Sequence, residues 1–131
     1  MKKLSVLFLA AVFCLSLVGC SKDAEINTFM AEFENVTNEM SKKIEDGDVD
    51  GAQTVFDGKK ESLKSKWASL KDARGFQVSE ATKKKMEDDF KKHGETLQKA
   101  VMKGTMKIAT DQAKVTKMQN LMKEFMGILQ M

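Results

Sequence analysis

The sequence predicts an all-α protein, an up-down bundle of three to four helices after a cleaved signal. The 131 residues include ten methionines and no proline, and Lys, Glu and Ala are abundant, a composition that favours helix. From residue 22 onward, apolar residues recur every three or four positions, as on one face of a helix. No segment alternates as a strand does. We expect one domain over residues 20–131.

The N-terminal residues 1–19 have the pattern of an export signal. Lys2 and Lys3 precede an apolar run over residues 4–18, which matches the basic and apolar regions of a secretory signal. The run has about 15 residues, whereas a membrane-spanning helix needs roughly 20. We therefore expect this segment to be removed after export.

The signal ends in the tetrapeptide Leu17-Val18-Gly19-Cys20. This motif resembles the lipobox of bacterial lipoproteins, and the resemblance covers residues 1–20. It implies cleavage before Cys20, a diacylglyceryl group on the Cys20 thiol and an acyl chain on its new amino group, which together anchor a protein stably. Ser21 stands where an inner-membrane lipoprotein often has aspartate. The resemblance thus implies an envelope lipoprotein, on the outer membrane and facing the periplasm in a Gram-negative host.

The resemblance also implies the fate of both cysteines. Cys14 would leave with the signal and Cys20 would carry lipid, so we expect the mature chain to have no disulfide and to be stabilised by packing.

The mature chain is nearly neutral, with 20 basic and 19 acidic residues, but its charges are unevenly distributed. Residues 22–57 hold three lysines and ten acids, and residues 58–131 hold 17 basic residues and nine acids. We expect the two parts to attract each other within the bundle. The alternative is a basic surface that faces anionic lipid headgroups. Nucleic acid is an unsuitable partner, because no basic face has interleaved aromatic residues.

The first helix begins near Lys22, and Gly47 ends it. Either Asp48 or Asp50 caps the second helix, which stops at Arg74-Gly75. Phe76 and Val78 then close the end of the bundle. The apolar stripe of the first helix is Ile26, Phe29, Met30, Phe33, Val36, Met40 and Ile44, and that of the second is Ala52, Phe56, Leu63, Trp67, Leu70 and Ala73.

Ser79 caps the third helix, in which Gly94 and Gly104 mark a close helix approach or a bend. An unbroken helix over residues 79–130 would be about 78 Å long, against about 36–39 Å for the first two, so a break is expected at 109–111 with Asp111 as a cap. The stripe of the third helix is Met86, Phe90, His93, Leu97, Val101 and Ile108, and that of the fourth is Val115, Met118, Leu121, Met122, Phe125 and Leu129.

The loop between the first two helices resembles an EF-hand calcium loop. Counted from Asp46, acids stand at positions 1, 3, 5 and 12 and glycine at position 6. Gln53 replaces the usual aliphatic residue, and the twelfth residue is aspartate rather than glutamate. The alternative is a plain helix junction in which aspartates cap the second helix. The calcium ligands would be Asp46, Asp48, Asp50 and Asp57.

Three other features suggest ligands. Met102 and Met106, and also Met118, Met122 and Met126, are spaced by four, so their thioethers could bind copper(I), although methionines at this spacing usually fill a core. His93 is the one histidine and could ligate haem, or be structural. An apolar or lipid ligand between the helices is the remaining alternative.

The favoured function is a binding or scaffolding module without catalytic activity or a cofactor. The sequence contains no nucleophile elbow, no phosphate-binding loop and no second histidine. The last helix has a broad apolar surface that either packs into the bundle or meets an envelope protein partner. The residues of this possible partner face are Met118, Met122, Phe125, Met126 and Leu129.

Overall fold

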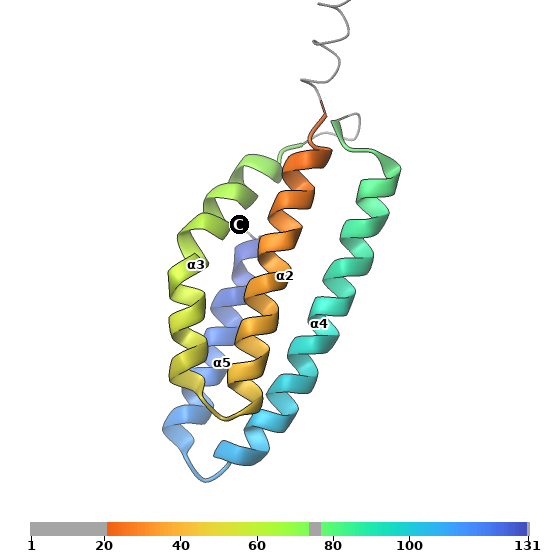
Figure 1. The fold of residues 1–131 in the computed structure, drawn as a ribbon. Helices are drawn as coiled ribbons and strands as arrows, with labels where there is room; N and C mark the ends of the chain where they lie inside the picture. The colour runs from red at the N-terminus through yellow and green to blue at the C-terminus, as the bar shows by residue number, and fades with distance from the viewer. Residues whose placement is uncertain (1–20, 74–76, 131) are drawn as a thin grey trace, which may run out of the picture.

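Four α-helices and no strand make up the residues that the computed structural model describes, 21–73 and 77–130 (Figure 1). The fold class predicted from the sequence is confirmed. The predicted signal peptide, Cys20, the stop at Arg74-Gly75 and Phe76 lie outside the described residues. The elements are α2 (Asp23–Glu45), α3 (Val49–Leu70), α4 (Glu80–Ile108), α5 (Gln112–Gly127) and the short 3-10 helix η2 (Ile128–Gln130).

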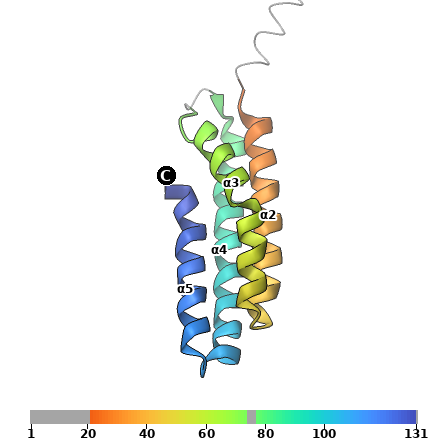
Figure 2. The same ribbon diagram turned by 90° about the vertical axis from the view of Figure 1, so that its left-hand side faces the viewer.

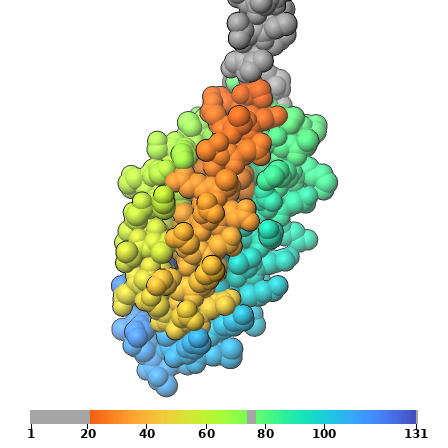
Figure 3. Space-filling model, in the orientation of Figure 1, coloured from red at the N-terminus to blue at the C-terminus, as the bar shows by residue number. Residues whose placement is uncertain are grey.

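The helices alternate in direction along the chain (Figures 1 and 2). α2 packs along both α3 and α4, and α5 packs against the same two helices from the other side. The space-filling view shows α2 filling the seam between α3 and α4 (Figure 3). We call the end with Lys22, Leu70 and Ser79 the proximal end, and the end with the turns at 46–48 and 109–111 the distal end.

The core is aromatic where α5 joins the other helices. The ring of Phe125 stacks on Phe33 at a centroid distance of 4.8 Å and meets the edge-on ring of Phe56 at 5.6 Å. All three side chains are fully buried. The apolar stripe of the last helix therefore packs into the bundle, which is the first of the two alternatives that the sequence left open for this helix.

Local chemistry fixes the helix ends as the sequence predicts. Asp48, Ser79 and Asp111 each accept a hydrogen bond from the backbone N–H three residues later, at 2.8, 3.2 and 3.1 Å. Gly47, just after α2, has a φ of 77°, which glycine adopts without strain. Val78, which the sequence predicts to close the end of the bundle with Phe76, is buried at the proximal end.

A glycine sets the closest approach between α2 and α4. A Cβ on Gly104 would lie 2.2 Å from the carbonyl oxygen of Ile44, so only glycine fits there. Gly94 has open space around the same position. Of the two alternatives predicted for these glycines, a close approach or a bend, the close approach is confirmed at Gly104 and is absent at Gly94.

The acidic first part of the chain pairs with the basic remainder, as expected. The ion pairs join acids of α2, of the turn after it and of the first turn of α3 to lysines of α3, α4 and α5 across the surface of the bundle. They are Glu32–Lys66, Glu34–Lys92, Glu45–Lys103, Asp46–Lys107 and Asp50–Lys117. Each such exposed pair contributes about 0–1 kcal/mol, so the pairs align the helices more than they stabilise them.

The last helix is too short to reach the proximal end. α5 has 16 residues and α4 has 29, which correspond to about 24 Å and about 44 Å of helix. Figure 2 shows α5 and η2 ending well below the tops of α3 and α4. The distal section of the bundle therefore has four helices, and the proximal section has three.

Candidate functional site

The proximal end is held together by hydrogen bonds from two backbone N–H groups. The Lys22 N–H donates to the Gln77 carbonyl at 2.7 Å, and the Ser79 N–H donates to Asp23 Oδ1 at 2.9 Å. The Ser79 bond is the main cause that lowers the pKa of Asp23 below its ordinary value. The start of α2 is thus joined to the segment that leads into α4.

A hollow of about 240 Å³ lies between α2, α3 and α4 at this end, and we call it the proximal hollow. Ile26, Leu70 and Val78 in its wall are buried, and the surface that they present is mainly apolar. No residue of α5 lines it, because that helix ends below this level. The lining residues are Ile26, Trp67, Leu70, Lys71, Ala73, Val78, Lys83 and Met86.

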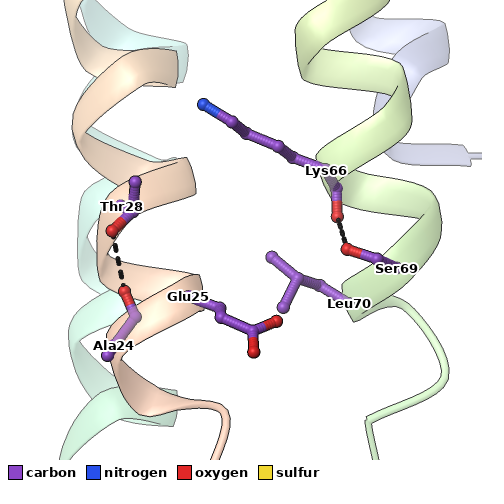
Figure 4. A pocket seen from close by; sticks show the side chains of 6 residues that line it. All are labelled: Ala24, Glu25, Thr28, Lys66, Ser69 and Leu70. Atoms are coloured by element: carbon purple, nitrogen blue, oxygen red, sulfur yellow. Dashed lines mark hydrogen bonds between the residues drawn. The ribbon is translucent and has the colours of Figure 1, made fainter.

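A second, shallower depression of about 270 Å³ lies between α2 and α3 on the outer surface, and we call it the outer groove. Figure 4 shows Leu70 projecting between the two helices. The Thr28 and Ser69 hydroxyls donate to carbonyls of their own helices, at 2.9 and 2.8 Å, and so leave mainly apolar atoms in the groove. Leu70 lines both the hollow and the groove.

Trp67 connects the hollow to the core. Its ring lies 5.3 Å from the ring of Phe29 and 6.3 Å from that of Phe90, between centroids. Its Nε1–H is buried and has no hydrogen-bond partner among the described residues. Trp67 is also the one tryptophan of the chain, so its fluorescence reports on the wall of the hollow.

The predicted calcium ligands lie at the distal end, where each has another role. Asp48 caps α3 and pairs with Lys43 at 3.2 Å, and the Gly51 N–H is the main cause that lowers its pKa. Asp57 accepts a hydrogen bond from Gln53 at 2.9 Å. Asp46 pairs with a lysine of α4, and Asp50 pairs with a lysine of α5.

No three His, Cys, Asp or Glu side chains within residues 21–73 and 77–130 are grouped so that they could hold a metal ion. The structure does not bring Asp46, Asp48, Asp50 and Asp57 together. It supports the plain helix junction for this loop, because one aspartate caps α3 and two others are paired with cations. Calcium binding stays a prediction of the sequence spacing.

The predicted partner face is divided by the fold. Met118 and Phe125 are 2% and 0% exposed and belong to the core, so assigning them to an exposed face is wrong. Met122 and Leu129 are partly buried against that core. Met126 remains exposed. Phe125 is buried because its ring fills the space between the rings of Phe33 and Phe56.

The most exposed large apolar side chains of the described residues are on α4. Met102 and Met106 are 63% and 75% exposed and lie one turn apart. They stand near the distal end of the helix, away from the proximal hollow. The sequence spacing suggested that these two methionines are copper ligands. Only the exposed fractions of their side chains show that they form an exposed apolar surface.

His93 lies inside the bundle. It is buried on α4 with its ring 5.8 Å from that of Phe33, and its Nε2 has no hydrogen-bond partner among the described residues. Desolvation is the main cause that lowers its pKa, so the imidazole is neutral at pH 7. Its position is that of a core residue within the aromatic cluster.

Comparison of the chain with protein-family models, with curated proteins and with solved structures found no match. Among the helices of the described part, none combines the length and apolar character needed to cross a membrane. The apolar pattern of the sequence did not predict the proximal hollow. The signal that could have revealed it is the length of the fourth helix, which is too short to cover the third.

Proposed function

We propose that this protein is an exported lipoprotein that is anchored to a membrane through Cys20 and acts there as a non-catalytic binding module. The observation that carries this proposal is the position of Leu17-Val18-Gly19-Cys20 directly before the bundle. Ser21 and Lys22 alone separate Cys20 from the first residue of α2. At roughly 3.3–3.6 Å per residue, such a linker keeps the proximal end at the membrane surface.

The aqueous side of the anchored bundle is its distal section. We propose that an envelope protein partner binds there, at the exposed thioethers of Met102 and Met106, because methionine side chains adapt to differently shaped apolar surfaces. In a Gram-negative host the anchor lies in the outer membrane and this section faces the periplasm. The buried position of the one histidine and the lack of a thiol in the mature chain support a role without catalysis.

Labelling with radioactive palmitate in a bacterial host tests the anchor. The full chain and its Cys14→Ala variant are expected to incorporate label and to sediment with membranes. The Cys20→Ala variant is expected to incorporate none. The Cys14 variant is the matched control, because that residue leaves with the signal. Unlabelled wild-type protein would refute the anchor.

A photo-crosslinking residue placed at position 106 or at position 39 tests the partner surface in intact cells. Both positions are exposed, but Glu39 lies on α2, away from the methionine pair. One discrete adduct is expected from position 106, and it should disappear when Met102 is also changed to Ser. Equal adducts from both positions, or none from position 106, would contradict the proposal.

A further inference from the structure

We propose that the proximal hollow takes up one acyl chain of a bilayer phospholipid, whose phosphate then lies beside Lys71. The proposal rests on the membrane anchoring proposed above for the orientation of the bundle. It assigns a ligand to a part of the molecule that the anchor alone leaves without a role.

The shape and lining of the hollow suit a single hydrocarbon chain. Its volume of about 240 Å³ is below the roughly 300–1,000 Å³ of pockets for drug-sized ligands, so a narrow ligand fits best. Its wall is mainly apolar and is formed by side chains such as Ile26, Leu70 and Met86. In this space an apolar chain would contact α2, α3 and α4 where α5 is absent, as α5 contacts the other helices in the distal section.

The charges at the rim match an anionic headgroup. Lys71 is exposed at the end of α3 and forms no ion pair within the described residues, whereas Lys83 is paired with Glu80 at 2.6 Å. Of the two lysines that line the hollow among the described residues, Lys71 is therefore the one without an ion pair and can meet a phosphate. Lysine suits this position because its aliphatic stem lies along apolar surface while its ammonium group stays in water.

The hollow lies at the level where lipid is expected. Ile26, in its wall, follows Lys22 by one helical turn, which is about 6 Å along the axis. Trp67 lines the hollow together with Lys71 and Lys83. The acyl chains on Cys20 are needed in the bilayer for stable anchoring, so a phospholipid is the better occupant.

The test uses a chain that begins at Ser21, because all four helices and the core cluster Ile26–Ile128 lie beyond that residue. This lipid-free chain is mixed with phosphatidylglycerol vesicles whose acyl chains carry bromine, which quenches tryptophan on contact. Trp67 is the one tryptophan of the chain and lines the hollow, so bromine in the hollow is expected to remove at least half of the tryptophan emission. Unchanged emission would overturn the proposal.

Two pairs of variants separate uptake into the hollow from adsorption on the surface. Ala73→Leu fills the proximal hollow and is expected to remove most of the quenching, whereas Ala24→Leu fills the outer groove and should leave it intact. Lys71→Glu should weaken vesicle binding several-fold, and Lys99→Glu, on the exposed surface of α4, should not. Circular dichroism checks first that each variant folds. Equal quenching in wild type and Ala73→Leu would refute the hollow as the site.

Brominated fatty acid without vesicles is a further arm. If it quenches Trp67 as strongly as the vesicles do, the ligand is a free fatty acid and the assignment to a bilayer phospholipid is overturned. Strong quenching by vesicles together with a failed palmitate labelling would refute the anchor and leave the hollow as a lipid site. Normal labelling without quenching would refute the lipid site alone.

Discussion

The distal and proximal sections of the bundle are built from the same helices but are packed differently. In the distal section Phe125 of α5 lies between Phe33 and Phe56, and none of these rings is exposed. In the proximal section Trp67 and Met86 are only partly buried and surround a hollow. The apolar stripes of α2 to α4 continue through both sections, so the length of the shortest helix decides where the core is complete.

This difference separates the closely packed core of the distal section from the proximal hollow, where we propose that lipid binds. Regions with few buried apolar contacts open at a lower cost in free energy than the core does, and binding sites are drawn from such regions. The distal section contains the fully buried aromatic core, whereas the proximal section contains the hollow to which the proposed ligand would bind. Substitutions matched between the two sections test this division.

Truncation of one apolar side chain in each section gives the largest contrast. Phe125→Ala is expected to lower the free energy of unfolding by about 3–5 kcal/mol, because it leaves a cavity among closely packed rings. Met86→Ala, in the wall of the hollow, should cost about 1 kcal/mol, since part of that side chain is already exposed. Urea unfolding followed by circular dichroism measures both. Equal losses would show that the two sections are packed alike.

Two glycines of α4 provide the next contrast. Gly104→Ala places a methyl group against the Ile44 carbonyl and should destabilise the protein by about 1–3 kcal/mol, because the helices must separate. Gly94→Ala meets open space and should stabilise it by about 0.5–1 kcal/mol through helix propensity. Thermal melts of both variants check the signs. A neutral Gly104→Ala would mean that α2 and α4 are free to move apart at the distal end.

The caps should behave alike in both sections. Ser79→Ala at the proximal end and Asp111→Ala at the distal end each remove one bond to a backbone N–H, and each should cost about 1 kcal/mol. Similar values from urea unfolding would show that packing distinguishes the sections while local helix chemistry does not. A much larger cost for Asp111→Ala would tie the cap to the packing of α5.

The helix boundaries could be predicted from the sequence because they depend on neighbouring residues. Asp48, Ser79 and Asp111 cap the helices that they precede, whatever packs against those helices. The exposure of the methionines could not be predicted, because Met118 and Met126 share one helix but meet different neighbours. The spacing of the aspartates in the loop could not decide between calcium binding and a plain helix junction, for a related reason. Lysines far along the chain, Lys107 and Lys117, pair with the carboxylates.

The smallest expected effect is a pH dependence that arises in the aromatic core. Desolvation lowers the pKa of His93 in the folded state, although the Glu34 and Asp89 carboxylates oppose it, and the Lys92 and Lys85 ammonium groups add to the lowering. The unfolded chain, with an ordinary pKa near 6.5, therefore takes up the proton first, so stability falls as the pH drops below that value. The carboxyl groups of Asp23, Glu32 and Asp48 have lowered pKa values, so they titrate at lower pH than the imidazole of the unfolded chain.

Urea unfolding at pH 7.5 and pH 5.5 measures this dependence. The wild-type midpoint should decrease between the two values, and the midpoint of His93→Leu should stay constant, because this variant keeps an apolar side chain in the cluster and has no titratable group there. The same decrease in both proteins would show that the proton is bound elsewhere. A wild-type midpoint that rises on acidification would show that His93 is charged in the folded state, so that the distal core contains a buried cation instead of a closed apolar packing.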